Sequence, residues 1–227
     1  MEGSKRRVNV RPPNRGKITS VLYKIAYYQN RSDEVPNQNL AADLARTKNA
    51  KGIAEIAENL GNANPNIRAD CLKVLYEIGY INPKLISSHA EKFVTLLSAR
   101  NNRLVWGAMI GLSTIAREQS VVIAAHIDEI IETMAKGSVI TVDNGIKTLA
   151  VVASKQAETR QKLLHFLIDH LKTCRSKEVP QHAESILVAI DANWKSQFVA
   201  VLESRQSEYI PSQAKRIKKV IREAQTL

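Results

Sequence analysis

The residues of this 227-residue chain best suited to chemistry are its five histidines, two cysteines and two tryptophans. His165 and His170 stand five positions apart, whereas two histidines that bind one metal from a single helix prefer a spacing of four. Cys71 and Cys174 lie far apart and match no metal-ligand spacing. The remaining histidines fall on separate predicted helices: His89, His126 and His182. The sequence therefore predicts no metal site.

The motifs of the common enzyme classes do not occur either. The sequence has no HExxH, no P-loop, no glycine-rich dinucleotide turn and no GxSxG. Two distant cysteines are typical of a reducing compartment, and the N-terminus lacks the apolar region of a secretory signal. No apolar run approaches the roughly 18 residues of a membrane span. We therefore expect a cytoplasmic protein with no catalytic residues, no cofactor and no small-molecule substrate.

An apolar pattern that recurs every 37 residues indicates which structural elements position the polar and charged side chains. The first copy has Leu75, Ile78 and Gly79, and a small residue precedes it at Cys71. The later copies, the last after a step of 38, are Leu112, Ile115 and Ala116; Leu149, Val152 and Ala153; and Leu187, Ile190 and Asp191. Their small residues are Ala108, Gly145 and Ala183. A period in this range predicts stacked helical repeats.

A second apolar stripe with the same period gives each repeat two helices. It begins with Ile53, Ile56, Ala57 and Leu60 and recurs at Phe93. We expect an all-α solenoid of antiparallel helical hairpins, with a final basic helix as its cap. The predicted parts are a disordered basic tail (1–16), a degenerate N-terminal unit (17–61), four repeats (64–99, 101–136, 138–173 and 177–205) and the capping helix (212–225). The degenerate unit is expected to have helices from Lys17, across Leu40–Arg46 and at Lys51–Leu60.

The first copy resembles the HEAT-repeat family, in which an apolar residue and an arginine precede small and aliphatic positions. Ile67-Arg68, Cys71, Leu75 and Ile78-Gly79 carry this resemblance, which extends over about residues 37–205. Later copies depart from it, with Val105, Val142 and Gln181 or Pro180 in place of the arginine. The resemblance implies a right-handed superhelix that binds macromolecules, with the helices of the second stripe on its concave side. Armadillo-like units of three helices remain an alternative.

A weaker resemblance is to the bacterial alkylpurine DNA glycosylases, small basic solenoids that hold damaged DNA with tryptophans and a carboxylate. Trp106 and Trp194 are followed four positions later by Ile110 and Phe198, so neither has a carboxylate on its own helical face. A site for a flipped base needs such polar groups. We therefore interpret Trp106 as a packing residue.

The net charge of +11 belongs to the two ends of the chain. Residues 1–31 contribute +7 and residues 212–227 contribute +4, which leaves the repeats neutral. Within the repeats, the helices expected to line the concave side carry an acidic face: Glu91, Asp128, Glu129, Glu132, His165 and Asp169. The turns between repeats carry a basic edge: Arg100, Arg103, Lys136, Lys172, Arg175, Lys177 and Arg205.

These patterns predict two kinds of partner. The first is a protein, bound by a monomeric scaffold at its concave face, because repeat surfaces recognise partners by shape. The alternative is a nucleic acid, bound by the basic ends and the basic edge, since phosphate neutralisation supplies most of the affinity for nucleic acids. The acidic face would repel phosphates, and this favours the protein partner. No membrane partner is expected.

Overall fold

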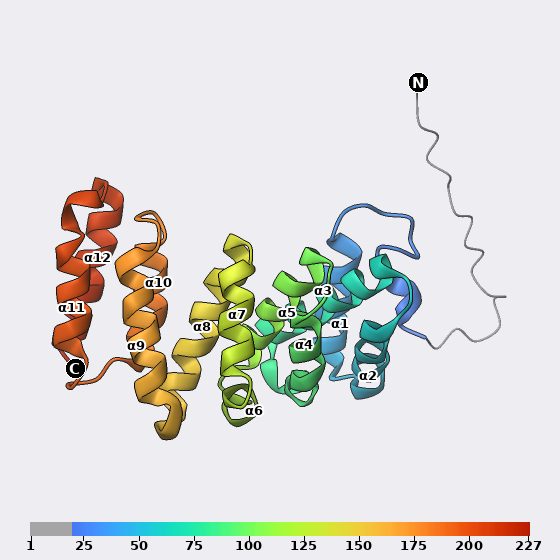
Figure 1. Ribbon diagram of the computed structural model, residues 1–227. Coiled ribbons are helices and arrows are strands. Elements are labelled where there is room, and N and C mark those ends of the chain that lie inside the picture. Colours follow the sequence, from blue (N-terminus) through green and yellow to red (C-terminus); the bar gives the residue numbers. More distant parts are fainter. Residues whose placement is uncertain (1–19) are drawn as a thin grey trace.

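The computed structural model describes residues 20–227, and Figure 1 shows them as one elongated stack of helices. This part of the chain has twelve α-helices, short 3-10 turns and no β-strand. The predicted basic tail (1–16) lies outside the described residues. The helices are α1 (Val35–Thr47), α2 (Ala50–Glu58), α3 (Pro65–Ile81), α4 (Ala90–Leu97), α5 (Asn102–Ile115), α6 (Ser120–Ala124), α7 (Ile127–Lys136), α8 (Val139–Lys155), α9 (Ala157–Thr173), α10 (Val179–Ile186), α11 (Lys195–Ser204) and α12 (Pro211–Gln225).

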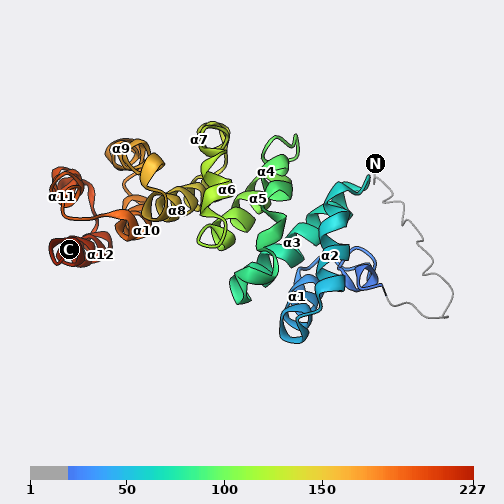
Figure 2. The ribbon, with the colours of Figure 1, turned by 90° about the horizontal axis from the view of Figure 1, so that it is seen from below.

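The stack has two rows of helices, and Figure 2 shows both rows from below. We call α1, α3, α5, α8, α10 and α12 the inner row, and α2, α4, α7, α9 and α11 the outer row. Successive inner helices pack directly on one another, as α3 does on α5 and α5 on α8, whereas successive outer helices make few contacts. Helices crowd together on the inner side of a curved solenoid and spread apart on its outer side, so the inner row lines the concave face (Figure 2).

This arrangement corrects one expectation drawn from the HEAT resemblance. The helices of the second stripe, such as α4 and α7, lie in the outer row and do not line the concave side. The apolar period identifies which face of each helix is buried. It does not say which row follows the shorter path around the curve, because that depends on packing between neighbouring repeats.

The recurring small residues let the two rows approach each other. Cys71, Ala108 and Ala183 are fully buried. A Cβ at Gly145 would collide with the side chain of Met134 on α7. Burial, together with the nearby charges of Asp70 and Glu55, raises the pKa of the Cys71 thiol to about 12. Cys71 is therefore a packing residue with an unreactive thiol.

The α-helix predicted from Lys17 does not form over the described residues. From Ser20 to Arg31 the chain has only a 3-10 turn (Leu22–Lys24) and further turns, and Asn30 adopts a left-handed backbone conformation (φ 52°). Residues 17–19 of that prediction lie outside the described part.

Side chains from later helices accept hydrogen bonds from backbone N–H groups that would bond within the segment if it were an α-helix. The Ala26 N–H donates to Asn37 Oδ1 (2.9 Å) and the Tyr27 N–H donates to Asp70 Oδ2 (2.7 Å). These acceptors lie on α1 and α3, and both side chains are buried. Because buried amides need partners, these long-range bonds hold the segment in its turns. The apolar period of the segment reflects burial against α1 and α2.

The first inner helix is longer than the sequence predicts. The sequence predicts a helix across Leu40–Arg46, but α1 starts at Val35, one residue before Pro36, and runs to Thr47. Proline is well tolerated in the first turn of a helix, where its missing N–H would have no intrahelical partner. Pro36 therefore opens α1, and Lys48 ends it in a left-handed conformation (φ 50°).

Candidate functional site

The concave face is formed by the sides of the inner helices that point away from the outer row. On α3 it presents Lys73 and Glu77, on α5 the half-buried Trp106, and on α8 the exposed Lys147 and the half-buried Val151. Positions on one helical face recur three or four residues apart, which places these residues opposite the small residues that contact the outer row. Trp106 thus lies in the inner row, where sequence reasoning treated it only as a packing residue.

Large hydrophobic side chains that are exposed to solvent are unevenly distributed over residues 20–227. None of them lies on an outer-row helix. Most lie on the inner helices or in the segments that continue them: Val35, Tyr80, Ile81, Val139, Ile140, Val188 and Ile210. The exposed large hydrophobics of the two rows therefore belong to the inner row, near the ends of its helices, while Val121 lies on α6, which belongs to neither row.

The charges of the concave face are only partly compensated. Lys73 Nζ lies 2.6 Å from Glu77 Oε1 and 4.9 Å from the centre of the Tyr76 ring, which ties that charge to its own helix. Arg117 and Lys147 have no acidic group within ion-pair distance among residues 20–227. Lys147 therefore gives the part of this face on α8 an uncompensated positive charge.

The predicted acidic face lies on α4, α7 and α9, in the outer row, and most of its charge is compensated. Lysines pair with three of its five carboxylates: Asp128 with Lys162 (2.5 Å), Glu132 with Lys136 (2.6 Å) and Asp169 with Lys172 (2.6 Å). The other two, Glu91 and Glu129, lie 3.4 Å and 3.5 Å from the imidazole of His126. His165 packs edge-on against the Trp194 ring, with centroids 4.8 Å apart. The structure therefore separates this set of residues from the concave face.

The predicted basic edge is similarly compensated. Five of its seven cations contact carboxylates: Arg103 with Glu34, Lys136 with Glu132, Lys172 with Asp169, Arg175 with Glu178 and Arg205 with Glu208. Arg205 is 9% exposed and donates to the Leu171 carbonyl (2.6 Å), so its expected place on an exposed edge is wrong. Arg100 and Lys136 line one cavity of about 520 Å³ together with Glu129 and Glu132.

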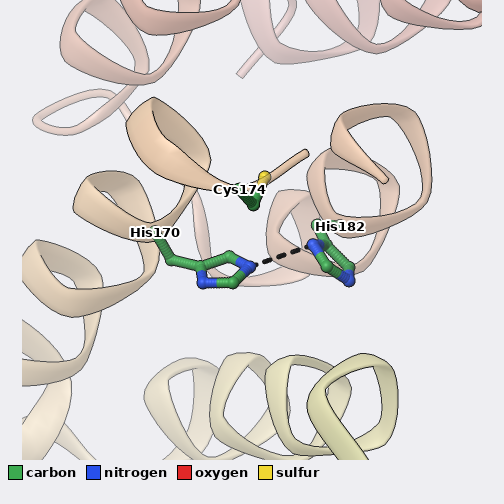
Figure 3. Close-up of side chains that lie close together, drawn as sticks. All are labelled: His170, Cys174 and His182. Atoms are coloured by element: carbon green, nitrogen blue, oxygen red, sulfur yellow. Dashed lines mark hydrogen bonds between the residues drawn. The ribbon is translucent and has the colours of Figure 1, made fainter. Parts of the chain in front are cut away.

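A second candidate site joins the end of α9 to α10, and Figure 3 shows its three side chains. His170 lies in the last turn of α9, Cys174 ends that helix, and His182 projects from α10. His170 Nε2 lies 3.0 Å from His182 Nδ1, and the three possible donor atoms lie within 4.8 Å of one another. The sequence, which places these residues on separate elements, does not predict that they come together.

The cluster is held by groups on two further elements. Asp143 Oδ1, on α8, lies 2.8 Å from His182 Nε2, and Arg205 Nη1, just after α11, lies 3.8 Å from Cys174 Sγ. Burial and the neighbouring His182 lower the pKa of His170 to about 4. Burial raises the pKa of the Cys174 thiol, although Arg205 acts in the opposite direction. At neutral pH the cluster therefore contains an uncharged His170 and a protonated thiol.

The histidine spacing pointed to the wrong pair of residues. In the sequence, His165 was considered as the metal-binding partner of His170. The side chain that lies close to His170 at the end of α9 is Cys174, four residues later. His182 joins them only because α10 folds back beside α9, and no local spacing contains that information. The His-x-x-x-Cys spacing was the one signal in the sequence that could have directed attention to this site.

No protein-family model matches the sequence, and a search of curated proteins gave no match. Solved structures do match. A designed armadillo repeat protein in complex with the peptide (KR)4 has a TM-score of 0.66 at 16% identity, over 90% of this chain and 100% of that one. Kap121p bound to Pho4p has a TM-score of 0.62 at 12% identity, over 88% of this chain and 22% of that one.

The fold is an armadillo/HEAT-like α-solenoid. A further solved structure, of an engineered protein, matches this chain with a TM-score of 0.62 at 19% identity. The match covers 92% of this chain and 100% of the engineered one. The expected all-α solenoid of helical hairpins is thus confirmed. None of the described helices of this solenoid is both long enough and apolar enough to cross a membrane.

Proposed function

We propose that this solenoid is a scaffold that binds an extended, acidic and partly apolar segment of another protein along its concave face. The observation that carries the proposal is the distribution of exposed hydrophobic side chains, which avoid the outer row. Exposed apolar side chains that gather on one side of a protein mark interaction surfaces. The half-buried Trp106 gives this face an aromatic anchor of the kind enriched in interface hot spots.

The charge of the concave face favours an acidic segment. Lys147 lacks an acidic partner among residues 20–227, and an incoming carboxylate would supply one. A solenoid of this fold has been solved with a basic peptide, (KR)4, which supports peptide binding as a use of the fold. The unpaired Lys147 on this chain's concave face favours a ligand of the opposite charge.

Nucleic-acid binding is the less favoured function. Affinity for nucleic acid rises with the number of cations available to phosphates. Within residues 20–227, carboxylates already engage five of the seven cations of the basic edge. A phosphate backbone would have to displace these intramolecular pairs.

Selection of peptides from a random library against the full-length protein tests the proposal. We expect the selected peptides to be rich in Asp, Glu and apolar residues. Fluorescence anisotropy then measures the affinity of one such peptide. Trp106→Ala should weaken binding by about 30-fold, the equivalent of ~2 kcal/mol, because interface aromatics contribute on that scale. Lys147→Glu should also weaken binding, through charge repulsion.

Lys92→Glu is the matched control for the charge change. Lys92 is also exposed and also lacks an acidic partner among the described residues, but it lies on α4 in the outer row. Its variant should bind the peptide like the wild type. Equal losses in Lys147→Glu and Lys92→Glu would contradict the assignment of the concave face. Selection of basic peptides, or a gel shift of RNA or DNA tighter than any peptide, would contradict the proposed partner.

A further inference from the structure

We propose that His170, Cys174 and His182 form a Zn²⁺ site that connects α9 to α10. Its donors are His170 Nε2, Cys174 Sγ and His182 Nδ1, which lie within 4.8 Å of one another (Figure 3). Imidazole nitrogens and a thiolate are all donors that zinc binds. Ca²⁺ and Mg²⁺ prefer oxygen ligands, so this chemistry excludes them. The zinc site stands independently of the proposed partner face.

The spacing of the donors suits a tetrahedral ion. Bonds of about 2.0–2.3 Å place the ligands of tetrahedral zinc about 3.3–3.7 Å apart. His170 Nε2 and His182 Nδ1 are 3.0 Å apart, slightly closer than this, and the largest separation in the cluster is at most 4.8 Å. Small side-chain rotations, with the thiol moving inward, would therefore complete the geometry. No movement of a helix is needed.

Two of the three ligands are positioned by one helix end. The Cys174 N–H donates to the His170 carbonyl (2.9 Å), which continues the helical bonding of α9 up to the cysteine. The four-residue spacing places the two side chains on the same face, one turn apart. The third ligand, His182, is fully buried on α10 and cannot turn away without losing its packing.

Asp143 positions the nitrogen that would bind zinc. His182 Nε2 donates to Asp143 Oδ1 (2.8 Å), so the proton is on Nε2 and the lone pair on Nδ1 points to His170 and Cys174. A carboxylate bound to the second nitrogen of a metal-ligating histidine is the usual supporting contact. Here it comes from α8, so the site would tie three consecutive helices together.

Charge and access also fit a divalent cation. The Cys174 thiolate and the Asp143 carboxylate would balance Zn²⁺, and the nearby Arg205 is already paired with Glu208 (2.5 Å). His170 and Cys174 are half-buried, which leaves an approach from solvent and room for water as the fourth ligand. On binding, the sulfur–zinc bond forms while the thiol proton passes to solvent.

Cobalt substitution tests the ligand set directly. Co²⁺ is titrated into the reduced, full-length protein, and absorption is followed. We expect a thiolate-to-cobalt charge-transfer band that saturates at one Co²⁺ per chain and disappears when Zn²⁺ is added. C174S should abolish the band, whereas C71S should keep it, because Cys71 is buried away from the cluster. Absence of the band from the wild type, or its survival in C174S, would overturn the proposal.

Thermal unfolding with and without Zn²⁺ tests the histidines. An ion that binds only the folded state raises Tm. The Zn²⁺-dependent rise should be present in the wild type and in H165N, which alters an exposed histidine on the same helix, and absent from H170N. Because His170 is half-buried, H170N should fold, and circular dichroism checks this. An equal rise in H170N, or none in the wild type, would refute the site.

Discussion

At the scale of single residues, buried polar groups decide where local sequence patterns fail to predict the structure. Asp70 is 7% exposed and Asn37 is fully buried, and each accepts a backbone N–H from the segment before α1. Neither contact could be predicted from spacing, because each joins residues of separate elements through packing. The His170–His182 contact escaped prediction for the same reason.

Asp70 should make stability depend on pH. Burial raises the pKa of its carboxyl, while the Tyr27 N–H, Asn37 and Arg103 oppose that shift and Glu34 adds to it. The folded state therefore retains the proton to a higher pH than the unfolded state, whose carboxyl titrates near 3.8. Stability contributed by this group is complete below the unfolded pKa and falls as pH rises through the folded pKa.

Asp70→Asn keeps an acceptor for the Tyr27 N–H but cannot titrate. Relative to this variant, the wild type should lose stability as the pH rises from about 4 to 7, as measured by urea unfolding. Asp70→Ala should cost about 1–3 kcal/mol relative to Asp70→Asn at either end of this pH range, because it leaves the part-buried Tyr27 N–H without a partner. If the difference between the wild type and Asp70→Asn stays constant across this range, the carboxyl of Asp70 does not titrate as predicted.

At the scale of elements, the period of the sequence predicted most helices because packing repeats with it. The recurring small position shows why, since Gly145 faces Met134 at the contact of α8 with α7. Pro36 shows the limit of local rules, because the same residue can break a helix or open one. Contacts between repeats decide whether a helix lies in the inner or the outer row. The sequence of a single helix therefore does not predict its row.

Gly145→Ala should destabilise the protein by about 1–3 kcal/mol, since the added methyl group would overlap the Met134 side chain. Gly61→Ala is the control, because nothing lies within 4 Å of its Cβ position and its φ is not positive. Urea unfolding measures both. In a Met134→Ala background the cost of Gly145→Ala should shrink, which a double-mutant cycle would show. If Gly145→Ala costs as much in the Met134→Ala background as in the wild type, the added methyl group does not clash with Met134.

At the scale of the whole molecule, contacts are local along the solenoid. Each inner helix packs on its neighbours in the stack, and α12 closes the stack against α10 and α11. In such architectures stability is approximately a sum of repeats and their interfaces. The sequence could predict this one-dimensional organisation from its period, but not the curvature, which depends on the difference in packing between the two rows.

A destabilising substitution at one end of the solenoid should therefore increase local unfolding only at that end. Ile217 is buried on α12, and Ile217→Asp should raise hydrogen exchange in α10, α11 and α12 while leaving α3 and α5 protected. Lys218→Asp changes the next, exposed residue and should leave exchange close to that of the wild type. An increase spread evenly over the chain after Ile217→Asp would show that the stack unfolds as one cooperative unit.

The unequal packing of the two rows has a mechanical consequence. The inner row is a continuous contact of close-packed helices and resists compression, whereas α7 and α9 in the outer row are linked by an exposed ion pair, Asp128 with Lys162. Exposed ion pairs are weak and are screened by salt. The curvature of the solenoid should therefore change mainly by separation of the outer-row helices, while the inner row stays packed. This bending should become easier as the ionic strength rises.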